Sequence, residues 1–309
     1  MMSLVSAKGA PGVTTTALAL ALVWPRPVLL VDADPRGGDV VWTFGQGQDT
    51  LGRGLLGAQV AARRGTWVEA VWSQVIAMVP GEDRWLLPGL DDAAQAGSID
   101  WTGLAGALGG LAGVDVIVDG GEVHSGRQLG PVRTASDVVW VVTRSTLPGV
   151  RGVRSAAPSL RAETHSSGVG VGVDRLGSVI VGPGRPYPTA EVTASLAELA
   201  PVRAELSWDP AGAEAVLRGR LSGRAFTRSG LGRAATTLAG QLLTSATDSA
   251  ADLEPAGPQP VSPVTPVPPA PPAPRPRLLS RSRLLSRSRL RSPAASVAES
   301  VRVSGGGVR

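Results

Sequence analysis

The sequence contains no cysteine, and among its 309 residues it has only two histidines. Without cysteine the chain can form no disulfide, no thiolate metal site and no cysteine nucleophile. The two histidines, His124 and His165, leave few ways to build a histidine metal site or a Ser-His-Asp triad, and we assign neither of them a role. These absences argue against zinc enzymes, thiol redox proteins and serine hydrolases.

Long apolar runs are also missing. No apolar stretch reaches the length of about 18 residues that a membrane-spanning helix requires. The first residues lack the charged region that precedes the apolar part of a signal sequence. We therefore expect a cytoplasmic protein, and association with the nucleoid or with a membrane surface stays open.

Lysine is nearly absent, because Lys8 is the only lysine beside 29 arginines. A composition that uses arginine at almost every cationic position has kept lysine at this one. The two side chains differ where a cation must enter a narrow phosphate-binding loop. The ammonium of lysine is compact, whereas the guanidinium of arginine is planar and larger and carries its donors in a fork. Lys8 is therefore a candidate for phosphate contact.

Proline and arginine are concentrated near the C-terminal end. Proline dominates Asp252 to Pro276, which favours extended, solvated backbone over a packed core. From Pro271 onward there are nine arginines and one glutamate, a charge of +8, so residues 1 to 270 carry about −3 of the whole-chain charge of +5. We predict one domain, residues 1–248, and a disordered tail, residues 249–309, which is first proline-rich and then arginine-rich.

The tail also contains a repeat, LLSRSR, at Leu278–Arg283 and again at Leu284–Arg289. A six-residue period does not match the 3.6 residues of a helical turn, so the leucines would not gather on one helix face. A tandem duplication in a solvated tail is one interpretation, and a selected binding element is the other.

Short apolar runs alternate with longer helical patterns in residues 1–248. This alternation predicts an α/β fold, a doubly wound and mainly parallel sheet with helices on both faces. The predicted strands are Met2–Ser6, Pro27–Asp32, Arg84–Leu87, Val114–Asp119, Asp137–Thr143, Ser178–Val181 and Val202–Leu206. The predicted helices are Thr14–Trp24, Arg53–Val79 (largely helical), Ile99–Leu111, Leu147–Glu163, Thr189–Leu199, Pro210–Gly219 and Leu231–Thr247.

A glycine-rich loop separates the first predicted strand from the first predicted helix. It reads SAKGAPGVTTT, residues 6–16. Glycines let the backbone approach an anion, and a helix N-terminus supplies unpaired N–H groups and a favourable dipole. Taken alone, the loop could equally be a plain structural turn. The candidate phosphate-binding residues are Lys8, Gly9, Ala10, Pro11, Gly12, Val13, Thr14 and Thr15.

Acidic residues follow two more of the predicted strands. The segment VLLVDADPRGG, residues 28–38, ends its strand with Asp32 and Asp34, and VDVIVDGG, residues 114–121, ends with Asp119. In open α/β sheets ligands bind outside the carboxyl ends of the strands, so these carboxylates are candidates for a site. A solvated loop is the alternative interpretation of Asp32 and Asp34.

Together these segments resemble the ParA/MinD-like family of P-loop ATPases, whose deviant Walker A motif is K-G-G-x-G-K-T-T. The resemblance extends from Met1 to about Thr146 and includes ASDVVWVVT at Ala135–Thr143, in which Asp137 is interpreted as structural. The style of the loop is similar to actinobacterial variants of the family. The resemblance implies a P-loop NTPase fold that binds ATP or ADP with Mg²⁺.

The resemblance also implies roles for individual residues. Lys8 would be the signature lysine that reaches the phosphates of a second subunit, and Thr14 would offer its hydroxyl to Mg²⁺. Asp32 would support the metal shell, Asp34 would orient the attacking water, and Asp119 would follow the Walker B strand. The implied catalytic residues are thus Lys8, Asp34 and Asp119, and the implied metal residues are Thr14, Asp32 and Asp119.

Three departures from the family pattern bear on activity. Ala10 replaces a glycine, and Val13 replaces the lysine that reaches the β- and γ-phosphates in ordinary P-loops. Loss of that cation removes charge neutralisation, so slow or absent hydrolysis is expected. Asp209 and Pro210 resemble the loop near the adenine, but Gly182-Pro183-Gly184 stands where the family often has asparagine.

The expected function is an ATP-dependent dimerising switch that positions cargo, with weak or slow hydrolysis. Such relatives act in chromosome or plasmid partition, in division-site placement, or in localising Tad-type pilus and secretion machinery. The expected partners are a second copy of the chain and a protein cargo or activator, and the tail could contact DNA non-specifically or an anionic membrane. The alternative is a pseudo-ATPase scaffold. A dinucleotide oxidoreductase is rejected because no G-x-G-x-x-G opens the first helix.

Overall fold

The computed structural model describes residues 1–8, 12–38, 40–44, 52–123, 127–165, 175–219 and 226–251. They belong to one compact unit, Met1–Pro255, whereas a second unit, Ala256–Arg309, lies outside the described residues. The predicted tail therefore lies outside them too, apart from its first residues, which belong to a helix that ends at Ala251.

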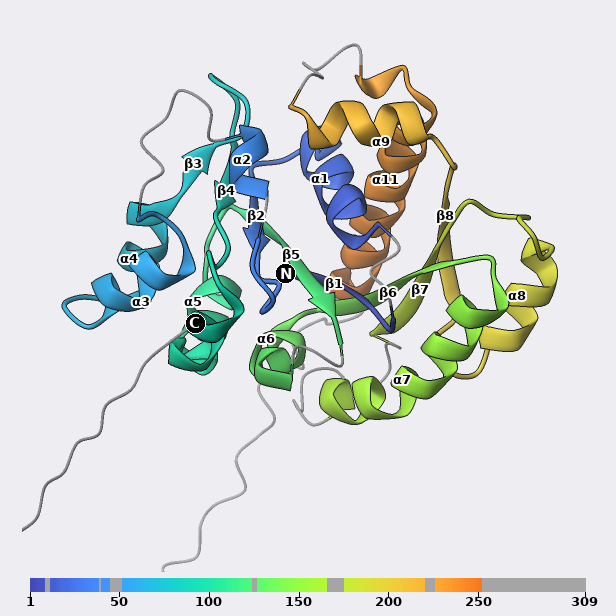
Figure 1. Cartoon of the computed structure of the whole chain (residues 1–309), viewed down its shortest axis with the longest axis horizontal. Helices are drawn as coiled ribbons and strands as arrows, with labels where there is room; N and C mark the ends of the chain where they lie inside the picture. Colours follow the sequence, from blue (N-terminus) through green and yellow to red (C-terminus); the bar gives the residue numbers. More distant parts are fainter. Residues whose placement is uncertain are drawn as a thin grey trace, which may run out of the picture. The chain divides into compact units, whose positions relative to one another are not determined.

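A mainly parallel sheet forms the centre of the first unit (Figure 1). In the described residues it has eight strands in the order β3-β4-β2-β5-β1-β6-β7-β8, and every pair is parallel except β3 with β4. The predicted α/β fold is confirmed. The strands are β1 (Met2–Ser6), β2 (Val28–Asp32), β3 (Ile76–Ala77), β4 (Arg84–Leu87), β5 (Asp115–Glu122), β6 (Val138–Arg144), β7 (Leu176–Val181) and β8 (Val202–Leu206).

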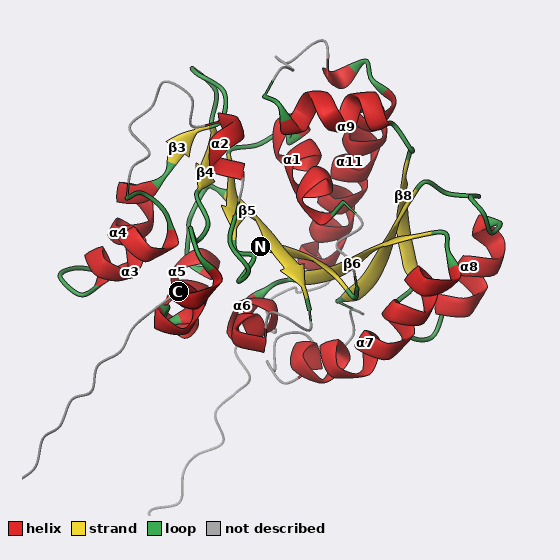
Figure 2. Cartoon of the chain, in the orientation of Figure 1, coloured by secondary structure: helices red, strands yellow, loops and turns green. Residues whose placement is uncertain are grey.

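Helices cover both faces of this sheet (Figure 2). Helices α1, α9 and α11 pack together on one face, and α5, α6, α7 and α8 lie on the other. The helices are α1 (Val13–Val23), α2 (Val40–Phe44), α3 (Leu55–Ala62), α4 (Trp67–Gln74), α5 (Trp101–Gly109), α6 (Gly130–Ala135), α7 (Leu147–His165), α8 (Thr189–Leu196), α9 (Pro210–Leu217) and α11 (Gly230–Ala251), with 3₁₀ helices η1 (Ala93–Ser98) and η2 (Arg127–Leu129).

Alternating side chains of the buried strands build a core on each face. In β2, Leu30 enters the apolar cluster below α1, whereas Leu29 and Val31 enter the cluster below α5. Successive side chains of a strand point to opposite faces, so a strand covered on both sides is apolar throughout. The same arrangement explains why α1, with the sequence VTTTALALALV, is apolar on most of its circumference: it lies between the sheet and α9 and α11.

The segment Arg53–Val79, predicted to be largely helical, is interrupted twice. Thr66 caps α4 through a capping box in which its hydroxyl accepts the N–H of Glu69 and the Glu69 carboxylate accepts the N–H of Thr66. This local bonding begins a new helix after α3. After α4, Val75 is extended and the next residues pair with β4 as strand β3. The prediction was therefore wrong at the turn and at the strand.

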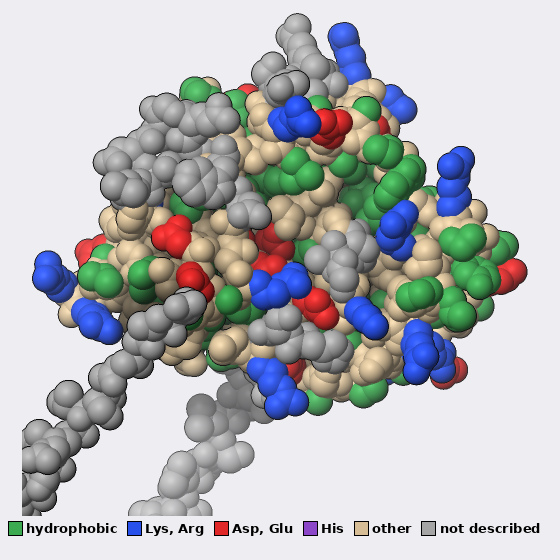
Figure 3. Space-filling view, in the orientation of Figure 1, with side chains coloured by type: hydrophobic (Ala, Val, Ile, Leu, Met, Phe, Trp, Pro, Cys, Tyr) green, Lys and Arg blue, Asp and Glu red, His purple; other side chains and the backbone are tan. Residues whose placement is uncertain are grey.

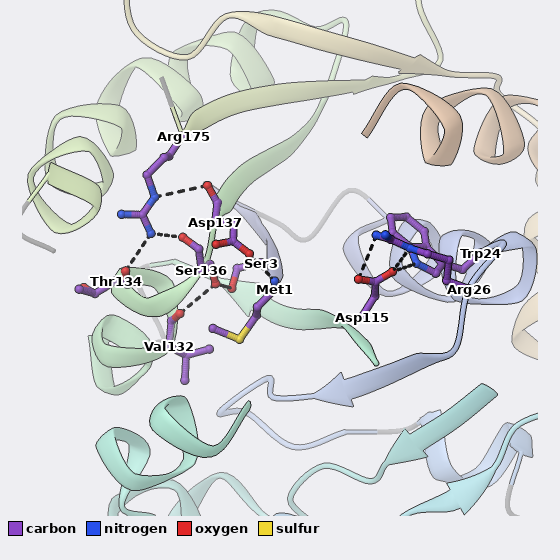
Figure 4. A network of polar contacts seen from close by, with 10 residues as sticks. All are labelled: Met1, Ser3, Trp24, Arg26, Asp115, Val132, Thr134, Ser136, Asp137 and Arg175. Carbon is purple, nitrogen blue, oxygen red and sulfur yellow. Dashed lines mark hydrogen bonds and ion pairs between the residues drawn. The ribbon is translucent and has the colours of Figure 1, made fainter. Parts of the chain in front are cut away.

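Polar contacts tie together the amino ends of the central strands (Figure 4). Before β6, the hydroxyl of Ser136 contacts that of Ser3 in β1 at 2.7 Å, and the Asp137 carboxylate lies 2.5 Å from the amine of Met1. At the start of β5, Asp115 accepts hydrogen bonds from Trp24 at 2.7 Å and from Arg26 at 2.8 Å. Asp137 thus lies at the edge opposite the carboxyl ends of the strands.

None of the helices in the described residues is both long enough and apolar enough to cross a bilayer.

Candidate functional site

The loop after β1 leads directly into the N-terminus of α1. Gly12 precedes the helix with φ 95°, a left-handed conformation that favours glycine. Among the described residues no side chain caps this helix, and Gly9, Ala10 and Pro11 lie outside them. The first N–H groups of a helix have no intrahelical acceptor, so this end of α1 can bind an anion.

The first turn of α1 separates an apolar side chain from hydroxyl side chains. Val13 is 1 % exposed and packs in the apolar cluster between α1 and the sheet. The hydroxyl of Thr14 is hydrogen-bonded to the Asp119 carboxylate, and that of Thr16 donates to the carbonyl of Gly12 at 2.7 Å. Thr15 is half-buried. Position 13 thus offers no cation to a phosphate, whereas Thr14 is held beside an acid.

Asp32 and Asp119 form a buried acidic pair at the carboxyl ends of β2 and β5. The two residues are partners in the strand register and are 2 % and 1 % exposed. Burial, and then the charge of Asp119, raise the pKa of Asp32 well above its usual range. Burial also raises the pKa of Asp119 to about 6, although hydrogen bonds from Thr14 and the Gly121 N–H lower it. Two adjacent buried carboxylates are costly unless a cation neutralises them.

One oxygen of this pair has no partner. Asp32 accepts backbone N–H groups from Val40 and Asp34, yet its Oδ2 atom is buried and, in the described part of the chain, receives no hydrogen bond. Glycines surround the carboxylate: a Cβ on Gly38 would lie 2.0 Å from Oδ2, and one on Gly89 would lie 2.9 Å from Cγ. The backbone at Gly38 and Gly89 therefore encloses the Asp32 carboxylate and leaves no room for a side chain at either position.

This donor set fits a magnesium ion better than a metal held by protein side chains alone. Across the described residues, no group of three or more acidic or histidine side chains could hold a metal ion. Mg²⁺ is usually bound through one or two carboxylates together with substrate phosphates and water. The hydroxyl of Thr14 and the carboxylate of Asp119 are suitable hard oxygen donors, and Asp32 would support Asp119 from behind.

Asp34 is held by a basic side chain that the sequence analysis did not single out. The guanidinium of Arg36 lies 3.1 Å from Asp34 Oδ2 and 3.4 Å from Glu122 Oε2. Asp34 also packs against the backbone of Gly121, where a Cβ would lie 2.3 Å from the carboxyl carbon. Figure 3 shows acidic and basic side chains side by side near the centre of this face. The position of Arg36, directly after the acidic segment Asp32–Pro35, was the sequence feature from which its pairing with these acids could have been predicted.

Lys8 lies in the loop between β1 and α1, next to α7. Its side chain is exposed, and a Cβ on Gly152 would lie 3.7 Å from the Lys8 Cβ. No ion pair of Lys8 with another described residue is present. Its ammonium group is therefore accessible to an anion from outside the chain.

The two residues predicted for the adenine lie farther along the sheet, after β8. The Asp209 carboxylate accepts the N–H of Gly212 at 2.8 Å and that of Leu231 at 3.0 Å, and these bonds lower its pKa. It therefore caps α9, which begins at Pro210, and joins it to α11. Beside it, Trp208 is 50 % exposed and the guanidinium of Arg144 lies 4.2 Å from its ring centre.

The structure thus brings some of the predicted residues together and leaves others apart. Thr14, Asp32, Asp34 and Asp119 meet at the adjacent carboxyl ends of β1, β2 and β5. Asp209 and Pro210 follow β8, three strands from β1. A ligand that contacted both groups would lie along the carboxyl edge of the sheet.

Solved structures of other proteins share this architecture, and some of those proteins were solved with a nucleotide bound. A ParA family ATPase from Chlorobium tepidum TLS matches with a TM-score of 0.60 and 18% identity, over 77% of this chain and 97% of that one. The fold is that of the ParA and MinD proteins. MinD from Pyrococcus horikoshii OT3, complexed with Mg-ADP, gives a TM-score of 0.60 at 21% identity, over 80% of this chain and 97% of that one.

An McdA variant from Cyanothece, in complex with ATP, matches with a TM-score of 0.57 and 16% identity, over 80% of this chain and 96% of that one. No protein-family model matches the sequence, and no curated protein matches it either. At these identities the likeness to ParA and MinD establishes the fold. The deviant Walker A motif and the actinobacterial style of the loop rest on the sequence.

Proposed function

We propose that the chain is an ATP-binding switch protein that uses Mg²⁺, dimerises with nucleotide bound and positions a protein cargo. The observation that carries this proposal is the buried Asp32–Asp119 pair beside Thr14 and the N-terminus of α1. Within the described residues, one oxygen of the pair has no hydrogen-bond partner and no side chain caps that helix end. Two buried carboxyl groups, which a cation would favour in their ionised form, lie beside an anion-binding helix end, and this arrangement suits a Mg²⁺–phosphate ligand. The structural relatives bound to Mg-ADP and to ATP support the same ligand class.

Each residue of the site would contribute in a definite way. The N–H groups of α1 would bind phosphate oxygens. The Thr14 hydroxyl, now hydrogen-bonded to Asp119, would bind the metal ion instead. Mg²⁺ would neutralise part of the phosphate charge. Asp34, fixed by Gly121 and by its own arginine partner, would face the terminal phosphate. No cation at position 13 assists departure of the terminal phosphate, so turnover would be slow.

Lys8 suits contact between two copies of the chain. It is exposed, it lacks an ion-pair partner among the described residues, and it stands at the entrance of the phosphate loop. In the resembled family this lysine reaches the phosphates of the second subunit. Dimer formation would then depend on nucleotide, and the dimer would be the form that binds cargo in partition, division-site placement or pilus localisation.

A pseudo-ATPase scaffold is the second candidate, and the burial of Val13 favours it. A position that holds a phosphate-directed cation in ordinary P-loops here contributes to the apolar core. In this alternative the fold binds protein partners, and nucleotide is bound without turnover or is not bound.

Calorimetry with ATP and ADP in the presence of Mg²⁺, together with light scattering, distinguishes the two candidates. The switch predicts that ATP binds and produces a dimer, that Lys8→Ala abolishes the dimer, and that Arg64→Ala leaves it unchanged. Arg64 is a suitable control because it is an exposed cation remote in sequence from the loop. If neither nucleotide binds at millimolar concentration, the switch is wrong and the scaffold is supported.

A further inference from the structure

Arg36 joins two loops at the carboxyl edge of the sheet. Its guanidinium contacts Asp34 in the loop after β2, through Nε at 3.3 Å and Nη2 at 3.1 Å, and Glu122 at the end of β5 at 3.4 Å. The side chain is 44 % exposed, whereas Asp34 and Glu122 are 17 % and 19 % exposed. Arg36 is thus held by carboxylates but remains accessible to a ligand from solvent.

Arg36 is a basic side chain among the acidic groups of the site. Four carboxylates, those of Asp32, Asp34, Asp119 and Glu122, lie at the ends of β2 and β5, and the charge of Arg36 lowers the pKa of Asp119. Lys8 lies on the opposite side of the loop, by α7. A polyphosphate that approached these four acids would be repelled unless a cation shielded it.

The order of the strands indicates which phosphate Arg36 would meet. The phosphate loop follows β1, the residues that resemble an adenine pocket follow β8, and β6 and β7 separate these strands. A nucleotide lying along this edge would therefore direct its terminal phosphate away from β8, toward β5 and β2. Arg36 and Glu122 stand at the ends of those two strands.

We propose that Arg36 recognises the terminal phosphate of the nucleotide, a binding contact that the valine at position 13 cannot make. The inference rests on the proposed function. Without ligand, Asp34 and Glu122 hold the guanidinium; with a nucleoside triphosphate bound, the guanidinium turns its fork of donors to the terminal phosphate. Arginine forms paired, charge-assisted hydrogen bonds with phosphate, which a diphosphate in the same position could not receive. Arg36 thereby sets the preference for ATP over ADP.

The test is the ratio of ATP to ADP affinity, measured by calorimetry on the full chain with Mg²⁺. Arg36→Gln is expected to weaken ATP binding roughly tenfold, the size of a charge-assisted contact, and to leave ADP binding within about twofold. Arg36→Lys should recover only part of the preference because it lacks the fork. The matched control is Arg26→Gln, which breaks an arginine–aspartate pair with Asp115 at the other edge of the sheet and should leave the ratio unchanged.

A second variant separates recognition from a structural role. Glu122→Gln removes one carboxylate that holds Arg36, so it should raise the preference for ATP, and this gain should shrink when Arg36→Gln is present as well. A purely structural ion pair predicts instead that Glu122→Gln weakens the binding of both nucleotides and leaves the preference unchanged. Equal losses of ATP and ADP affinity in Arg36→Gln would overturn the inference and leave the switch intact. Failure of the unaltered chain to bind either nucleotide would overturn both.

Discussion

At the scale of single residues, the acidic pair couples stability to ligand binding. Asp119 has a folded pKa of about 6, whereas an ordinary aspartate has 3.8. The folded state therefore holds a proton more tightly than the unfolded state, and stability falls as pH rises from about 4 to about 6. Above that range the buried carboxylate is ionised and can bind a cation. The same charge that weakens the empty fold would strengthen the binding of Mg²⁺.

Asp119→Asn tests this coupling. In the absence of nucleotide the variant should melt at a higher temperature than the unaltered chain at pH 7.5, because a buried charge has been removed, and the difference should vanish near pH 4. The variant should also lose the Mg²⁺-dependent stabilisation by ATP. Thermal melts between pH 4 and pH 8, with and without Mg-ATP, measure both effects. Asp115→Asn is the control on the same strand, and it should lower stability because Asp115 accepts from Trp24 and Arg26.

Position 13 offers a second test at this scale. Val13→Lys places an ammonium at the start of α1, so ATP affinity should rise roughly tenfold, as expected for a charge-assisted phosphate contact. The variant without nucleotide should be less stable than the unaltered chain, because Val13 packs in the apolar core and a lysine there would bring a charged group into it. Val13→Met, which has comparable length and no charge, should gain no affinity. Calorimetry and melting curves record the two effects, and an equal gain with methionine would contradict the role of the cation.

At the scale of elements, the strands that carry the site were easier to predict than the segments around them. β1, β4 and β8 have the predicted bounds. β1 is buried throughout and is a short apolar run between turns, whereas in the edge strand β8 exposed residues alternate with partly buried ones. The acids at the ends of β2 and β5 followed from that prediction. The turn at Thr66, the two-residue strand β3 and the short helix α6 were missed, since their apolar residues also fit a helix or a loop.

The contacts of Arg36 could not be predicted for a different reason. Asp34 and Glu122 are far apart in the sequence, and only the pairing of β2 with β5 brings them to the same guanidinium. A residue pattern records which side chains follow a strand. It does not record which neighbouring loop they contact, so the candidate acids were found without their arginine partner.

Two glycines, one near the end of β5 and one inside α5, should respond oppositely to substitution by alanine. Gly121, at the end of β5, has φ 59°, and its Cβ would overlap the Asp34 carboxylate. Gly121→Ala should therefore lower stability by more than about 1 kcal/mol and weaken nucleotide binding. Gly106, exposed in α5 with nothing within 4 Å of its Cβ position, should gain about 1 kcal/mol on substitution. Urea unfolding compares the pair, and equal effects would refute the strain at Gly121.

At the scale of the whole molecule, charge is divided between two parts of the sequence. Residues 1 to 270 carry about −3, and the residues from Pro271 carry +8. A nucleotide site surrounded by acids and a separate basic segment can work independently, because the second needs only an anionic surface. Binding of such a surface would be electrostatic and would weaken steeply with salt.

Deletion of residues 252–309 tests this division. The truncated chain should keep its nucleotide affinity and its dimer, since the acids, Thr14 and Lys8 all precede the deletion. Its affinity for duplex DNA without sequence preference should fall at least tenfold at low salt, the loss expected when several arginine–phosphate contacts disappear. The full chain with Arg281, Arg283, Arg287 and Arg289 changed to Gln should behave like the truncation. Fluorescence anisotropy with labelled DNA, and co-sedimentation with phosphatidylserine vesicles, distinguish a nucleic acid from a lipid surface; unchanged binding to both would show that the basic segment has neither role.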